Sequence, residues 1–337
     1  MMERRLLGPT GTAVSAVGLG CMGMSDLYGP ADRAEAIATI HAALEAGISL
    51  LDTGDFYGAG HNEMLIAESL RGRPREKVFI AVKFGAMRAP DGTFIGLDCR
   101  PAAVKNFLAY TLKRLSTDYV DLYQPSRIDP AVPIEETVGA IKQMADAGHV
   151  RHIGLSEAGA ETLRRAHAVH PISWLQIEYS LMSRGIEAEI LPTARELGIP
   201  ITAYGILSRG LLGGHWSSGD GKGPRDIRAH LPRFAGDNLA RNLGLVEALR
   251  VIAQEIGASV AQLAIAWVVS RGADIIPLLG ARRRDRLQEA LGALQLKLTP
   301  EILSRLEGAI PAERVAGTRY DPRQMAMLDS ETRSGGS

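Results

Sequence analysis

The stretch Leu-Leu-Asp-Thr-Gly-Asp-Phe-Tyr-Gly at residues 50–58 runs from the end of an apolar strand into a loop that carries a carboxylate and a phenol. The next apolar strand ends in a lysine, so Asp52, Tyr57 and Lys83 all lie at or just past predicted strand ends. A buried lysine and aspartate beside a tyrosine lower the free-energy cost of ionising the phenol. The three residues therefore predict a proton donor suited to the reduction of a carbonyl group.

Short apolar strands alternate with amphipathic helices along the rest of the chain. The predicted strands are Val17–Gly20, Ser49–Asp52, Val78–Lys83, Val120–Gln124, His152–Ser156, Trp174–Glu178, Pro200–Tyr204 and Ile275–Leu279. The predicted helices include Val104–Leu115, Ile134–Ala147, Ile186–Leu197 and Leu245–Ile256. Two further helices are expected to begin at capping boxes, one at Asp32/Glu35 and one at Ser259/Gln262 that runs to about Ser270. Eight strand–helix units predict a closed (β/α)8 TIM barrel with a parallel sheet.

An N-terminal β-hairpin is expected before the barrel, with strands at Arg4–Leu7 and Ala13–Val17 around the turn Pro9–Gly11. We expect one domain over residues 1–330 and a flexible tail over residues 331–337. A doubly wound sheet is the alternative, because residues 18–23 match G-x-G-x-x-G. In that fold the third glycine opens a helix, whereas Asp26, Gly29 and Pro30 delay the helix here. We therefore interpret the match as fortuitous.

The composition favours a small-molecule partner. Lysine plus arginine and aspartate plus glutamate number 38 each, which removes any bulk electrostatic case for binding nucleic acid or an anionic membrane. No apolar run approaches the roughly 20 residues that a membrane helix needs. Only Cys21 and Cys99 are present, without metal-ligand spacing, so neither a disulfide framework nor a metal site is indicated and a cytoplasmic location is expected.

Polar or special residues lie at or just beyond seven of the predicted strand ends, which is where barrel enzymes place their catalytic groups. These residues are Asp52, Lys83, Ser126, Ser156, Gln176, Tyr204 and Gly280. With residues 51–58, Gly154–Glu157, Ala203–Tyr204 and Gly280–Arg283, the chain resembles the aldo-keto reductase superfamily from the hairpin to roughly Leu306. The resemblance implies that Tyr57 protonates the carbonyl oxygen, that Lys83 lowers the pKa of Tyr57, and that Asp52 keeps Lys83 charged.

The resemblance also implies NADPH as the cofactor, extended over the barrel mouth with its nicotinamide stacked on Tyr204 and its carboxamide bound by Ser156 and Gln176. The other positions expected to bind it are Gly20, Met22, Asp52, Gly205, Leu207, Ser208, Gly210, Gly280, Arg282, Arg286 and Glu289. The basic run 282–286 follows the last strand, where barrels bind phosphate, and favours NADPH because NADH lacks the 2′-phosphate. Glu157 stands where many relatives have asparagine.

One position departs from the family pattern. Ser126 occupies the place of the histidine that completes the usual catalytic tetrad. Serine cannot titrate near neutrality, so we expect it to orient the substrate and to leave room for a bulkier ketone. The expected substrate pocket is Tyr28, Phe56, Phe84, Met87 and Trp216, and this mainly apolar set favours an apolar or cyclic carbonyl or alcohol.

Three functions remain open on the sequence. The first is an NADPH-dependent aldo-keto reductase or alcohol dehydrogenase that interconverts carbonyl and alcohol reversibly. The second is a nicotinamide-binding regulatory subunit with little turnover, since the chain also resembles potassium-channel β-subunits and Ser126 favours weak catalysis. The third is a non-redox barrel enzyme whose arginines bind a phosphorylated substrate.

His152, which alternates with Gly154 and Ser156, is expected to be a core residue inside the barrel.

Overall fold

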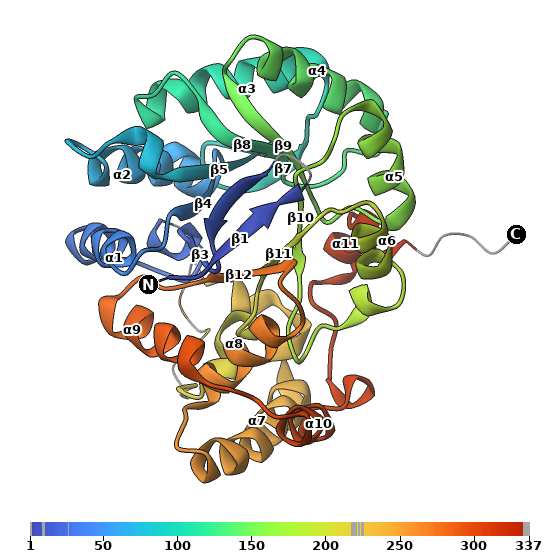
Figure 1. Cartoon of the computed structure of the whole chain (residues 1–337). Coiled ribbons are helices and arrows are strands. Elements are labelled where there is room, and N and C mark those ends of the chain that lie inside the picture. Colours follow the sequence, from blue (N-terminus) through green and yellow to red (C-terminus); the bar gives the residue numbers. More distant parts are fainter. Residues whose placement is uncertain are drawn as a thin grey trace, which may run out of the picture.

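The computed structural model describes residues 2–8, 11–25, 27–216, 221, 223 and 226–332. Eight parallel strands close into a barrel in which strands that follow one another along the chain are neighbours (Figure 1). They are β3 (Gly18–Gly20), β4 (Leu50–Gly54), β5 (Phe79–Phe84), β8 (Val120–Pro125), β9 (Val150–Ser156), β10 (Trp174–Glu178), β11 (Ile201–Tyr204) and β12 (Ile275–Leu279). The predicted (β/α)8 fold is confirmed, and the doubly wound alternative is wrong.

Helices surround the barrel and connect its strands (Figure 1). They are α1 (Arg33–Glu45), α2 (His61–Ser69), α3 (Pro101–Leu115), α4 (Ile134–Asp146), α5 (Ala160–Val169), α6 (Ile190–Glu196), α7 (Gly236–Glu255), α8 (Val260–Ser270), α9 (Arg284–Gly292), α10 (Pro300–Ala309) and α11 (Pro322–Met325). The capping box of Ser259 and Gln262 is confirmed at the start of α8. At α1 only half of the expected box forms, because the Glu35 carboxylate binds Arg284 instead of the Asp32 backbone.

Two predicted helix starts are wrong. The helix expected from Leu245 begins at Gly236, through a polar segment that shows little amphipathic pattern. The helix expected from Ile186 begins at Ile190, after a short 3-10 turn at Gly185–Glu187. Proline at position 192 cannot donate a backbone hydrogen bond, so it suits the first turn of α6 and not the interior of a longer helix.

Two hairpins accompany the barrel. The predicted N-terminal hairpin consists of β1 (Arg4–Leu7) and β2 (Thr12–Ser15); Pro9 and Thr10 of its expected turn lie outside the described residues. Its Leu7 and Val14 join the apolar cluster inside the barrel, so the hairpin closes that end. The second hairpin, β6 (Ala86–Arg88) and β7 (Phe94–Leu97), lies between β5 and α3 and was not predicted.

Glycines let large side chains fill the barrel interior. A Cβ on Gly18 would lie 2.7 Å from side-chain atoms of Leu50 and Leu278, and one on Gly154 would lie 2.8 Å from the Trp174 ring. The first glycine of the G-x-G-x-x-G match therefore serves core packing. His152 is buried in the same interior, where its ring stacks on Phe79 with ring centroids 5.8 Å apart, as a core histidine should.

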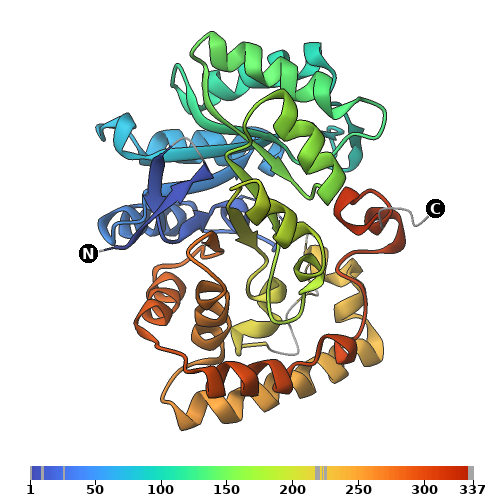
Figure 2. The same cartoon turned by 45° about the vertical axis from the view of Figure 1, so that its right-hand side comes forward.

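The C-terminal end of the chain packs back onto the barrel. Helix α10 lies alongside α7, and the segment that follows it, shown in red in Figure 2, returns towards α5. Glu331 belongs to this packed segment through its ion pair with Arg319, so the expected tail does not begin at residue 331. Residues 333–337 of that tail lie outside the described residues. Among the described helices no single one has the length and apolarity to cross a membrane; only α7 and α8 taken together, bent by 88° at their junction, meet that test.

Candidate active site

A buried ion pair lies at the carboxyl end of the barrel strands. Lys83 Nζ is 2.7 and 2.8 Å from the two carboxylate oxygens of Asp52, and Gln176 Nε2 donates a third hydrogen bond of 2.7 Å to Asp52. The side chains of the pair are only 5% and 6% exposed. Burial lowers the pKa of Lys83, while the Asp52 charge and hydrogen bonds oppose that shift. The strand ends thus hold three polar groups in one rigid arrangement.

Tyr57 lies over this pair in the loop after β4. Lys83 Nζ is 5.1 Å from the centroid of its ring, and the side chain is 6% exposed. Burial, followed by the negative charge of Asp52, raises the pKa of Tyr57 well above its ordinary value, whereas Arg127 acts in the opposite direction. Burial thus sets the net direction of the shift, which is upward and not downward as the sequence predicts. The phenol therefore keeps its proton at neutral pH, as a proton donor must.

Ser126 follows β8 at the same end of the barrel. Its backbone N–H donates to the Phe84 carbonyl at 2.8 Å, and its own carbonyl accepts from Arg127 Nη1 at 2.6 Å. The side chain is 2% exposed, and its hydroxyl has no hydrogen-bond partner among the described residues. A buried hydroxyl without a partner is costly unless a ligand or water completes it.

Three further rim positions lie on neighbouring strands. Ser156 and Gln176 are level in the register of β9 and β10, and Gln176 is level with Thr202 on β11. The Ser156 hydroxyl is also buried without a hydrogen-bond partner in the described part of the chain. Tyr204, at the end of β11, donates its hydroxyl to Glu157 at 2.6 Å. These groups form a polar shelf beside the ion pair.

The loop after β11 has the conformation of a backbone cradle. Gly205, Ser208 and Gly210 all have positive φ, at 65°, 46° and 103°. A Cβ on Gly205 would lie 3.0 Å from the Glu178 side chain, so glycine is required there on two grounds. Arg209 extends from this loop, and its Nη2 is buried, 3.5 Å from Glu178, without a hydrogen bond to any described residue.

The basic run after β12 is largely paired within the protein. Arg283 binds Asp285, Arg284 binds Glu35, and Arg286 binds Glu289 at 3.0 Å. Arg282 instead donates to the carbonyls of Tyr28 and Pro30, at 3.0 and 3.2 Å, and has no carboxylate partner within the described residues. The side chains of Arg283, Arg284 and Arg286 are 43–61% exposed, so these ion pairs are open to exchange with a ligand phosphate.

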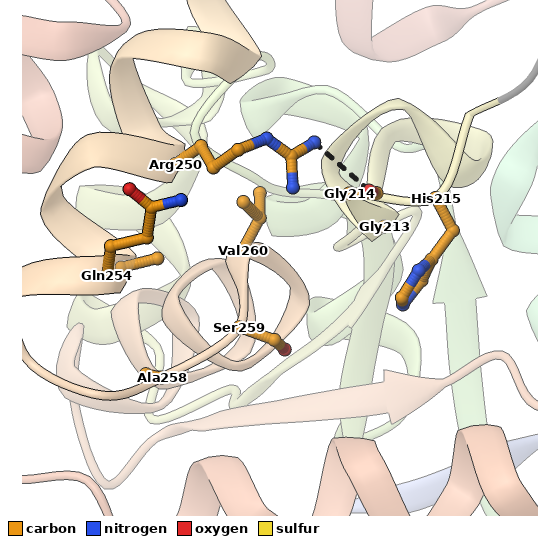
Figure 3. Close-up of a pocket in the computed structure, with 9 residues that line it drawn as sticks. Gly213, Gly214, His215, Arg250, Gln254, Ala258, Ser259 and Val260 are labelled. Atoms are coloured by element: carbon orange, nitrogen blue, oxygen red, sulfur yellow. Dashed lines mark hydrogen bonds between the residues drawn. The ribbon is translucent and has the colours of Figure 1, made fainter.

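A cavity of about 110 Å³ lies next to this run, between the loop after β11 and the turn from α7 to α8. Figure 3 shows Arg250 reaching across it to the Gly214 carbonyl, at 3.1 Å, with His215 on the other side. His215 Nε2 contacts the Glu289 carboxylate at 3.1 Å, which links the cavity to α9. The cavity and the basic run are thus parts of one surface.

The residues expected to form the substrate pocket make separate contacts in the structure. Phe56 contacts Tyr57 edge-on at 4.8 Å, and Arg228 lies over both Tyr28 and Trp216. Met87 is half-buried on β6.

Phe84 does not line the mouth. It is fully buried, stacked on Tyr123 with ring centroids 4.3 Å apart. Successive strand residues point to opposite faces, so Lys83 faces the barrel axis and Phe84 faces the helices. Phe84 therefore lies outside the substrate pocket to which the sequence assigns it.

Several functional candidates have no strong signal in the sequence. Arg127 directly follows the tetrad position, and its place beside a strand end was the one available indication. Arg319 and Tyr320 come from the segment after α10, which has no periodic pattern. Both contact the shelf around Tyr204. In the described part of the chain, no cluster of histidine, cysteine and acidic side chains is arranged to hold a metal ion.

Two further buried carboxyl groups, Asp55 and Glu63, lie near one arginine, Arg114, which forms an ion pair with Glu63. Burial, followed by the Glu63 charge, raises the pKa of Asp55 well above its ordinary value. Such a group favours folding below its unfolded pKa of about 3.9, and this contribution is lost as the pH rises through the folded pKa. We expect Asp55→Asn to raise the free energy of unfolding by about 1 kcal/mol at pH 8 and to have no such effect at pH 4. Urea unfolding at both pH values checks this, with Glu76→Gln at an exposed position as control; a loss of stability at pH 8 in Asp55→Asn would contradict it.

Comparison with known proteins agrees with this geometry. The model of the Aldo/keto reductase family matches residues 16–311. The chain is 43% identical over 317 residues to the "Probable aldo-keto reductase 1" of Glycine max, covering 93% of this chain and 90% of that one. Solved structures similar to this chain include a glycerol dehydrogenase from Gluconobacter oxydans (TM-score 0.81, 27% identity, 99% and 98% of the two chains) and the holo form of an aldo-keto reductase from Bacillus halodurans (TM-score 0.76, 26% identity, 93% and 97%). The chain belongs to the aldo-keto reductase family and is an oxidoreductase of that type.

Proposed function

We propose that this protein is an NADPH-dependent reductase of aldehydes or ketones, reversible towards alcohol oxidation, with Tyr57 as the general acid and base. The observation that carries the proposal is the buried, protonated Tyr57 above the Asp52–Lys83 pair. When bound, the nicotinamide supplies a hydride to the carbonyl carbon. Tyr57 donates the proton to the carbonyl oxygen, and the Lys83 charge stabilises the phenolate that remains.

The residues of the shelf fit a nicotinamide. The Ser156 hydroxyl lacks a partner among the described residues, and the Gln176 amide nitrogen is committed to Asp52, which leaves its carbonyl oxygen as an acceptor. A carboxamide has both a donor and an acceptor and would satisfy both groups. The ring of Tyr204 is half-buried, and the hydrogen bond from its hydroxyl to Glu157 holds it in place. It therefore offers a fixed face on which the nicotinamide can stack.

The remainder of the cofactor fits the adjoining surface. The cradle at residues 205–210, with the buried Arg209 guanidinium, suits a pyrophosphate. Gly20, Met22 and Gly280 border the mouth at the ends of β3 and β12. We propose that the adenosine lies by Glu289 and the cavity shown in Figure 3.

We propose that Arg282 and Arg286 bind the 2′-phosphate. Arg286→Ala should raise the Kd of NADPH about tenfold and leave the Kd of NADH unchanged, because a charge-assisted hydrogen bond contributes about 1.5–3 kcal/mol. Fluorescence titration with both nucleotides measures this. Arg283→Ala is the matched control, since it removes an exposed, ion-paired arginine of the same run that we do not assign to the 2′-phosphate. Equal losses for NADPH and NADH would rule out a role in recognising the 2′-phosphate.

The aromatic lining of the mouth favours an apolar or cyclic carbonyl substrate, and Ser126 leaves more space beside Tyr57 than histidine would. We expect Ser126→His to lower kcat/KM for cyclic ketones about tenfold relative to small aldehydes, because a pocket that loses the volume of several methylenes discriminates on this scale. Steady-state kinetics on both substrate classes gives the ratio. An unchanged ratio would show that Ser126 does not shape the pocket.

Consumption of NADPH across a panel of aldehydes, cyclic ketones and quinones tests the proposed function, with Tyr57→Phe as the control. Turnover of at least one class by the wild type and its loss in the variant supports the proposal. Equal turnover by both proteins, for every substrate, would refute the mechanism.

A nicotinamide-binding regulatory subunit is the second candidate, and Ser126 is the observation that favours it, because the usual histidine is missing. That candidate predicts tight binding of NADPH without turnover on any member of the panel.

Cys21 and Cys99 are both free and buried, which is compatible with the reducing cytoplasm that we propose as the location.

A further inference from the structure

The segment after α10 crosses the mouth of the barrel and is anchored on both sides of the candidate site. Asn242 exchanges hydrogen bonds of 2.9 Å with Ala316 on one side. On the other side, the Asp329 carboxylate accepts from the Gly159 backbone N–H at 2.6 Å. Figure 2 shows this red segment against α5. Residues 315–331, named the C-terminal strap here, are therefore part of the site and not an appendage.

The strap meets the site at Glu157, which is fully buried and has a positive φ of 54°. Its carboxylate accepts from Tyr204 at 2.6 Å, from Arg319 at 2.9 and 3.1 Å, and from the Ser330 hydroxyl at 2.5 Å. Burial has the largest single effect and would raise the pKa of Glu157, but Arg319, Arg127 and Ser330 together outweigh it and hold the pKa well below its usual range. Glu157 is therefore an ionised acceptor.

The direction of the neighbouring hydrogen bonds follows from that charge. Tyr204 has one hydroxyl proton and gives it to Glu157, so in the 3.1 Å contact between Tyr204 and Tyr320 the donor is Tyr320. Arg127 Nη2 donates to the same Tyr320 oxygen at 3.1 Å. The chain of donors runs from Arg127 through Tyr320 and Tyr204 to Glu157, with every proton assigned.

Tyr320 is also held by its ring. The guanidinium of Arg209 lies 4.7 Å from the ring centroid and that of Arg127 lies 5.7 Å away. Arg127 has no carboxylate partner among the described residues, so Tyr320 is the side chain that fixes its position. Arg127 in turn binds the carbonyl of Ser126, the residue that replaces the tetrad histidine.

We propose that Tyr320 is a positioning residue of the active site, whose hydroxyl fixes the Tyr204 ring for the nicotinamide and holds the Arg127 guanidinium next to Ser126. The inference rests on the proposed function. In this arrangement the strap, through Arg127, supplies a fixed positive charge near the substrate carbonyl, in a site that lacks the imidazole. The same charge acts on Tyr57 and favours its ionised form.

Tyr320→Phe keeps the ring between the two guanidinium groups and removes only the hydroxyl. We expect the Kd of NADPH, followed by fluorescence, to rise about fivefold, since the loss of one hydrogen bond in a buried network is worth roughly this factor. We also expect the alkaline limb of the kcat profile for reduction to move to higher pH, because Arg127 is released from its place near Tyr57. The exposed Tyr110→Phe on α3 is the matched control and should leave both quantities unchanged.

Arg127→Met separates the effect on the Kd of NADPH from the effect on the pH profile. It also tests the inference if Tyr320→Phe fails to fold. It should move the alkaline limb as Tyr320→Phe does, while the Kd of NADPH stays at the wild-type value because the Tyr204–Tyr320 bond remains. A Tyr320→Phe protein with a lower Tm but unchanged Kd and pH profile would overturn the inference, as would an unshifted limb in Arg127→Met. A wild-type protein that binds no NADPH would instead refute the proposed function.

Discussion

Replacing Tyr57 with phenylalanine should lower kcat for carbonyl reduction by about 10²–10⁴-fold, the usual contribution of a general acid. The ring of Tyr57 would still fill its place beside Phe56, so the Kd of NADPH and the Tm should change little. Absorbance of NADPH at saturating substrate measures the loss, and cofactor fluorescence provides the control. A variant that retains wild-type kcat would show that another group donates the proton.

The same residue sets the pH dependence of the wild type. Because burial and the Asp52 charge raise the pKa of Tyr57, the phenol remains protonated through the neutral range. Reduction, which needs the protonated form, should therefore be insensitive to pH from 6 to 8 and fall only at alkaline pH, while oxidation of the alcohol should increase as the pH rises. If the rate of alcohol oxidation reached its plateau below pH 7, Tyr57 would already be ionised there, and this assignment would be wrong.

Replacing Lys83 with methionine should lower the free energy of unfolding by about 3–5 kcal/mol and abolish measurable reduction. The substitution leaves the buried Asp52 carboxylate with only the Gln176 amide as a partner, and an uncompensated buried charge carries a cost of this size. Urea unfolding followed by circular dichroism gives the stability, and assays at low temperature keep the variant folded while its activity is measured.

The double variant Asp52→Asn/Lys83→Met distinguishes the two roles of the pair. Without the buried charge, most of the lost stability should return, since replacing both members of a buried ion pair is often nearly neutral. Catalysis should not return, because the cation near Tyr57 is still missing. A double variant as unstable as Lys83→Met would show that packing, and not charge, accounts for the loss.

The fold and the centre of the site were predictable from local sequence. Each barrel strand is a short apolar run, and a parallel sheet places all of its carboxyl ends at one rim. That rule alone brings Asp52 and Lys83 together, although they are 31 positions apart. Ser259 and Gln262 likewise mark the start of α8 through a contact within one turn.

The remainder depends on contacts that leave no local pattern. Tyr320 meets Tyr204 across 116 positions, from a segment without periodicity, so nothing in its own sequence indicates the mouth of the barrel. The misplaced Phe84 has another cause: its neighbours identify the strand end, but only the orientation of the strand decides which residue faces the axis. The raised pKa of Tyr57 depends mainly on its burial, which the spacing of charged residues does not predict.

Transfer of deuterium from NADPH labelled at the nicotinamide C4, with each face labelled in turn, tests the central claim most directly. We expect one of the two labelled cofactors to place a single deuterium on the carbinol carbon of the product, and the hydroxyl proton to come from solvent. Tyr57→Phe should slow this transfer by at least 100-fold. A product without deuterium from either cofactor, or equal transfer by wild type and Tyr57→Phe, would contradict the central claim.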